Sequence, residues 1–99
     1  MPEIEFDLLR EAAGGKGNFG VGSLTREQAD AVGRAWVGDG ATLSKSGKAW
    51  TSADGTRVYR PASYKPYFGA WQANLETRIP GQVTGLPIGN AHIDILDIP

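Results

Sequence analysis

The chain has no cysteine, one histidine and one methionine among its 99 residues. Without cysteine it forms neither disulfides nor thiolate metal sites, so packing alone must hold the fold. It also lacks an apolar run of membrane-spanning length and a basic-then-apolar signal segment at its start. We therefore expect one monomeric domain without a metal, a cofactor or contact with a membrane.

Acidic and basic residues nearly balance, and the net charge is −1. They are unevenly distributed, because residues 45–78 hold six basic and two acidic side chains, a net charge of +4. This segment predicts a local positive field that would attract an anionic partner. A solvated sheet face with scattered cations explains the same count, and both interpretations stay open.

The first 22 residues give few structural signals. Glu3–Arg10 fits a strand by alternation and a short helix by its i, i+4 spacing. Gly14–Gly22 contains five glycines and a G-x-G-x-x-G match. That match binds dinucleotides only between a strand and a helix, with a second parallel strand following, and hairpins follow here. We predict a flexible linker, with residues 1–22 as an N-terminal segment and residues 23–99 as the functional domain.

Leu24–Gly38 is predicted to be a helix. Thr25 and Gln28 have the spacing of a capping box, and Gly38 is placed to end the helix. An apolar stripe follows the helical period, which indicates that one side packs on a flat surface; its residues are Ala29, Val32, Gly33, Trp36 and Val37.

After residue 40 the period changes to two, which predicts strands at 41–44, 48–53, 56–60, 71–79 and 91–96. Ser46-Gly47 and Asp54-Gly55 fit hairpin turns, the second of type I′. Pro61 should end its strand because proline has no N–H to donate. The order of elements predicts an α+β fold, with an N-terminal helix on one face of a four- to five-stranded antiparallel sheet.

If Val58, Leu75 and Ile93 face the helix, alternation gives the open face of the sheet a polar set of residues. That set comprises Arg57, Tyr59, Gln72, Asn74, Glu76, Arg78, His92 and Asp94. A polar open face is common in antiparallel sheets, so the residue types carry the information.

Together these types suit metal-free cleavage of RNA, in which the 2′-OH attacks the adjacent phosphate. The reaction needs a base, an acid and cations that stabilise the phosphorane. Histidine changes charge near neutral pH, and we expect His92 and Glu76 to move the protons, in an order left open. Arg57, Arg78 and Lys65 would hold the phosphate. We expect further RNA contacts from Tyr59, Arg60, Tyr64, Tyr67, Gln72 and Asn74.

Two alternatives remain. A metal-dependent nuclease would use Asp54, Glu76 and Asp94, and Glu76-Thr77-Arg78 is similar to the carboxylate-x-lysine of PD-(D/E)xK nucleases. Arginine here replaces the lysine that helps to activate water. The other alternative is a non-catalytic module that binds a protein through its polar face.

Residues 17–97 resemble the C-terminal toxin modules of bacterial polymorphic toxins. The matching pieces are an AWVG helix end, a SADG-x-R-x-YRP hairpin, a KP loop, a QAN-x-E-x-R strand and a GN-x-H-x-D finish. Such modules end contact-dependent inhibition proteins and Rhs-type effectors. The chain departs from the family pattern at Ala62, Leu75 and Ala91, where proline, phenylalanine and glycine are common.

The resemblance implies a ribonuclease, often one that cuts tRNA, with the barnase/EndoU/colicin/RelE arrangement of a helix followed by an antiparallel sheet. It implies functional positions at Arg57, Tyr59, Lys65, Gln72, Asn74, Glu76, Arg78 and His92. It also implies secretion as part of a larger effector, delivery into the cytoplasm of target bacteria, and a cognate immunity protein in the producer.

Overall fold

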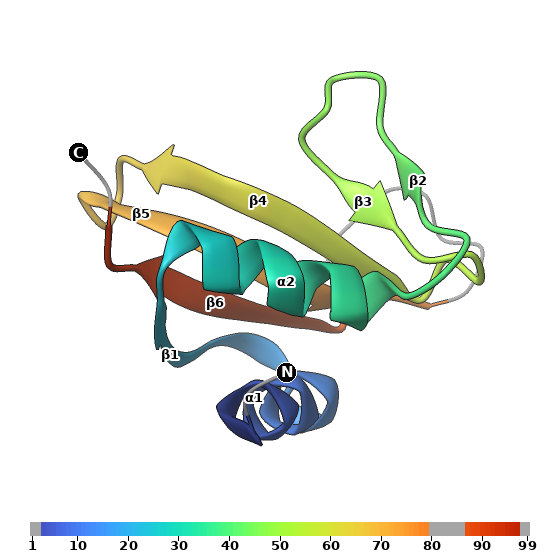
Figure 1. Cartoon of the computed structure of the whole chain (residues 1–99), viewed down its shortest axis with the longest axis horizontal. Coiled ribbons are helices and arrows are strands. Elements are labelled where there is room, and N and C mark those ends of the chain that lie inside the picture. The colour runs from blue at the N-terminus through green and yellow to red at the C-terminus, as the bar shows by residue number, and fades with distance from the viewer. Residues whose placement is uncertain (1–2, 80–86, 98–99) are drawn as a thin grey trace.

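The computed structural model describes residues 3–79 and 87–97. Over these ranges the chain forms two helices and one six-stranded sheet, with strand order β1-β6-β5-β4-β3-β2 (Figure 1). The elements are α1 (Glu3–Gly14), β1 (Gly17–Leu24), α2 (Arg26–Val37), β2 (Thr42–Leu43), β3 (Trp50–Thr51), β4 (Arg57–Lys65), β5 (Ala70–Thr77) and β6 (Gly89–Ile95). The α+β class is confirmed, but the sheet is larger than predicted and mixed, because β1 runs parallel to β6.

Helix α2 begins at the predicted capping box. The hydroxyl of Thr25 accepts a hydrogen bond from the backbone N–H of Gln28 (3.2 Å), whose side chain accepts one from the backbone of Thr25 (3.0 Å). Gly38 has a φ of +70° at the other end and donates its N–H to Arg34 O. Thus local capping sets both ends of the helix that covers the sheet.

The core lies between α2 and one face of the central strands (Figure 1). The whole predicted stripe of α2 is buried there, against Ala73, Leu75, Ala91 and Ile93. Indole Nε1 of Trp36 donates to the backbone oxygen of Glu76 (3.2 Å), so the largest core side chain also ties the helix to β5. The inward parities predicted for the last two strands are confirmed, since Leu75 and Ile93 have no exposed surface.

The side chains of strand β4 that face the helix are the ones predicted to face the open side. Tyr59 pairs with Leu75 and is 2% exposed, so it faces the helix instead of the open side. Its ring lies against Gly33, where a Cβ would overlap the ring, and its hydroxyl donates to Asp30 (2.6 Å). A glycine recess and a carboxylate acceptor in α2 together make room for a buried tyrosine.

The predicted linker is wrong over Gly17–Gly22. These residues belong to β1, whose alternating Phe19 and Val21 pack against the core. The preceding helix α1 buries Leu8 and Ala12 in the same core, which settles the ambiguity at Glu3–Arg10 in favour of a helix. The proposed boundary at residue 22 therefore falls inside a strand of the sheet. Glycine is disfavoured in strands, so the pairing with β6 overrode the local preference.

The β3–β4 turn occurs where it was predicted, although it is not type I′. Gly55 N donates to Ser52 O (2.9 Å), and Gly55 has a φ of +75° while Asp54 does not have a positive φ. Asp54 accepts hydrogen bonds from Thr56 and Ser52. The bonds from Thr56, then that from Ser52, lower the pKa of Asp54 to about 2. The carboxylate thus holds the turn closed, a structural role.

Pro61 does not end its strand. Strand β4 continues to Lys65, and the pairing register with β5 shifts between Arg60 and Ser63. Proline lies in this bulge, where the ladder needs no N–H from it.

Gly33→Ala should destabilise the protein, although alanine is favoured over glycine inside a helix by about 1 kcal/mol. The added Cβ would collide with the ring of Tyr59, and overpacking of this kind costs roughly 1–3 kcal/mol. Urea unfolding of the wild type and the variant measures the change. The cost should shrink in a Tyr59→Leu background, and an equal cost there would show that the ring is not its cause.

Candidate functional site

The open face of the sheet, opposite α2, contains a cleft of about 290 Å³. Six of the predicted site residues line it: Arg60, Lys65, Gln72, Asn74, Glu76 and His92. The remaining lining residues are Asn18, Phe68 and Asn90, which sequence reasoning missed. We call this hollow the open-face cleft.

The three missed residues differ in whether the sequence pattern could have placed them in the cleft. Asn90 shares the parity of His92 on β6, but it precedes the predicted start of that strand. Asn18 lies in the glycine-rich stretch that was taken for a linker, and Phe68 lies in a turn, where no periodicity shows direction.

Five predicted site residues do not line the cleft: Arg57, Tyr59, Tyr64, Tyr67 and Arg78. Arg57 is on the helix side, with its guanidinium carbon 4.2 Å from the centre of the Trp36 ring. Tyr59 is in the core, where burial and the hydrogen bond to Asp30 raise the pKa of its hydroxyl. Tyr64 pairs with Trp71 across the strands and contacts that ring edge-on, at 6.2 Å between centroids. Assigning Arg57 and Tyr59 to the open face was therefore wrong, since β4 has the opposite parity.

Glu76 is the most enclosed charged group of the cleft, at 4% exposure. Its Oε2 accepts from Arg60 Nε (2.7 Å), and its Oε1 accepts from Arg78 Nε (3.0 Å) and lies 2.9 Å from Arg78 Nη2. A buried carboxylate needs such partners, because an unpaired one would lose its hydration without compensation. Both oxygens are thus occupied, and the carboxylate holds Arg60, which lines the cleft, and Arg78, which does not.

Lys65 is the second cation that lines the cleft. Its amine donates to Ser63 (2.9 Å), and burial, followed by the positive charge of Arg60, lowers its pKa while Glu76 acts in the opposite direction. A lowered pKa raises the share of neutral amine, the form that accepts a proton. A neighbouring hollow of about 510 Å³ shares Arg60 and Lys65 with the cleft and reaches Lys48, which extends the cationic surface.

His92 lies in the middle of the open face. On β5 its partner is Asn74, and on β1 its partner is Gly20. A Cβ at Gly20 would lie 3.1 Å from Nε2 of His92, so the glycine leaves just enough room for the imidazole. The ring of Phe68 stacks on the imidazole, with 6.2 Å between centroids and 26° between planes.

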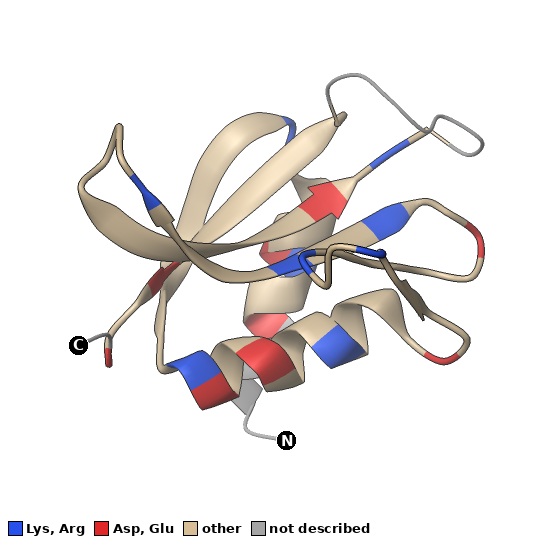
Figure 2. Cartoon of the chain, turned by 90° about the horizontal axis from the view of Figure 1, so that it is seen from above, with Lys and Arg blue, Asp and Glu red and all other residues tan. Residues whose placement is uncertain are grey.

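Helix α2 carries charges of both signs. Figure 2 shows both acidic and basic positions along α2, which carries Arg26, Glu27, Asp30 and Arg34. Among residues 3–79 and 87–97, no three His, Asp or Glu side chains are grouped so that they could hold a metal ion. No helix within these ranges is long and apolar enough to cross a membrane.

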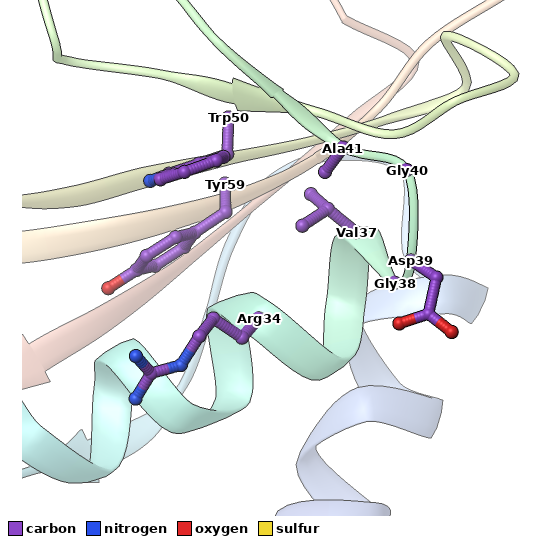
Figure 3. Close-up of a pocket in the computed structure, with 8 residues that line it drawn as sticks. All are labelled: Arg34, Val37, Gly38, Asp39, Gly40, Ala41, Trp50 and Tyr59. Atoms are coloured by element: carbon purple, nitrogen blue, oxygen red, sulfur yellow. The ribbon is translucent and has the colours of Figure 1, made fainter.

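A third hollow, of about 330 Å³, lies on the helix side between the end of α2 and the β2–β3 hairpin (Figure 3). Its walls include the rings of Trp50 and Tyr59, with Arg34 and Asp39 at the margin. The groups suited to proton transfer lie on the other face, so we place the candidate site in the open-face cleft.

No protein-family model, curated protein or solved structure matches the chain.

Gly20→Ala should move the His92 ring by a few tenths of an ångström while the fold remains intact, because Gly20 has no positive φ. The loss of unfolded-state freedom favours alanine by about 0.4–1 kcal/mol, which offsets part of the new contact. NMR suits this test, since the only histidine gives a single set of imidazole signals. Those signals should shift in Gly20→Ala and stay in place in Ser23→Ala, on the same strand. Unchanged signals in both variants would contradict the close contact.

Proposed function

We propose that the protein is a metal-independent endoribonuclease of the toxin-module type, with its active site in the open-face cleft. The observation that carries the proposal is that one cleft gathers the only histidine, a half-buried lysine of lowered pKa and an arginine-bound carboxylate. These are the groups for proton transfer and for neutralising the phosphorane. The toxin part of the proposal, including a larger secreted effector and an immunity protein, rests on the resemblance.

In the proposed reaction the 2′-oxygen of one nucleotide attacks its own 3′-phosphorus. A base takes the 2′-hydroxyl proton, the P–O5′ bond breaks, and an acid protonates the leaving 5′-oxygen. The products are a 2′,3′-cyclic phosphate and a 5′-hydroxyl, so atoms and electrons balance without a co-reactant.

The geometry favours His92 and Lys65 as the two proton-transfer groups. Both oxygens of Glu76 already accept hydrogen bonds from arginines. Its better role is to hold Arg60 and Arg78 in place, so that they meet the developing negative charge without reorganising. The same engagement of both oxygens disfavours the alternative in which Glu76 coordinates a metal ion.

The purified protein should cleave total bacterial RNA in the presence of excess EDTA and leave 2′,3′-cyclic phosphate ends. Gel analysis, with end-group mapping of the products, measures both points. If EDTA stops cleavage and Mg²⁺ restores it, the metal-dependent alternative replaces this mechanism. If RNA stays intact under both conditions, the non-catalytic alternative is favoured.

His92→Ala should lower the single-turnover rate by about 10²–10⁴-fold, the usual cost of losing an acid or base. Its stability should change by no more than about 0.5 kcal/mol, because the imidazole lies outside the core. Glu27→Gln, at an exposed acid of α2 on the other side of the sheet, is the control and should cleave normally. A His92→Ala variant that melts and cleaves like the wild type would remove His92 from the mechanism.

A further inference from the structure

The β4–β5 turn carries two exposed aromatic rings, and one of them, Phe68, lines the cleft. Tyr67 is fully exposed and Phe68 is 69% exposed. Lys65 O accepts hydrogen bonds from Phe68 N (3.1 Å) and Gly69 N (2.9 Å), and Gly69 has a φ of +62°. The turn is therefore closed by its own backbone, and it displays Phe68 as a wall of the cleft instead of burying it.

The floor of the cleft consists of carboxamides. Asn74 Nδ2 donates to Asn90 Oδ1 (2.9 Å), and Gln72 Nε2 donates to Asp94 (2.8 Å). The other end of the Asn74 carboxamide, Oδ1, is buried and has no hydrogen-bond partner among the residues that the structure describes. Asn74 is 8% exposed, and a buried polar atom of this kind is satisfied in most proteins.

The second wall is cationic, formed by Arg60 and Lys65, and it continues toward Lys48. An aromatic wall, a carboxamide floor and a cationic wall match the three parts of a nucleotide. A ring stacks on the flat face of a base, a carboxamide bonds to the edge of the base, and cations bind the phosphate. In a duplex the faces and edges of the bases are already occupied by stacking and pairing.

We propose that the open-face cleft takes one unpaired RNA nucleotide, with its base against Phe68 and the edge of that base toward Asn74. A cleft of about 290 Å³ suits a single nucleotide. This inference rests on the proposed ribonuclease function and adds its substrate class, which is single-stranded or looped RNA. Phe68 is then a specificity-determining residue. Its ring also stacks on the imidazole of His92.

The test uses a short RNA made uncleavable by 2′-O-methyl groups, as a single strand and as a duplex with its complement. Fluorescence anisotropy gives the Kd of each for the wild type and the variants, and thermal melts confirm folding. Phe68→Ala should weaken single-strand binding by roughly 5- to 150-fold, the range for losing one base stack. Phe68→Tyr keeps the ring and should restore binding. Leu43→Ala, at an exposed apolar site on β2, is the control and should bind normally.

Single-strand binding by Phe68→Ala within about twofold of the wild type would overturn the proposal, since one stack is worth more than that. Equal affinity of the wild type for the duplex and the single strand would also overturn it. The parallel assay is cleavage of the unmodified single strand by the wild type. Phe68-dependent binding without cleavage would keep the nucleotide site and reject the ribonuclease proposal, whereas absence of binding to both RNAs would reject the site.

Discussion

The open face of this protein depends on how the carboxylate of Glu76 is accommodated. The side chain is almost fully buried in the middle of the sheet, and each of its oxygens meets an arginine. Such an arrangement adds little net stability compared with apolar packing, but removing one partner typically costs roughly 3–5 kcal/mol. The exposed part of Arg60 reduces that figure through solvent screening. What the arrangement provides is position, because it holds two guanidinium groups against one carboxylate.

The bulge in β4 completes this cationic wall. Arg60 and Lys65 are five positions apart, so in a regular strand they would point to opposite faces of the sheet. The register shift around Pro61 reverses the parity once, and both side chains reach the cleft. A proline that looked like the end of a strand therefore places the second cation beside the first. This arrangement follows from pairing with β5, which explains why local sequence rules did not find it.

The sequence predicts well those elements whose hydrophobic pattern is compatible with only one buried face. Strand β5 has an unbroken polar parity, so Gln72, Asn74 and Glu76 were placed correctly, as was His92 on β6. The capping box located α2 to within two residues at each end. The pattern of residues 56–60 allows two orientations, because each face of that strand carries one large apolar side chain, Val58 or Tyr59. Both side chains are buried. Gly33, more than twenty positions earlier, decides between them by leaving a recess for the tyrosine ring.

The glycine-rich strand β1 is another element that local sequence rules did not predict. Local propensity assigns a glycine-rich stretch to a loop, yet this stretch pairs in parallel with β6 and makes that strand an interior one. His92 consequently has a neighbouring strand on both sides, and on one of them its partner is a residue without a side chain. Any larger residue at Gly20 would crowd the imidazole. The low strand propensity of β1 is thus the cost of an open approach to the one histidine, at the position where the proposed chemistry requires space.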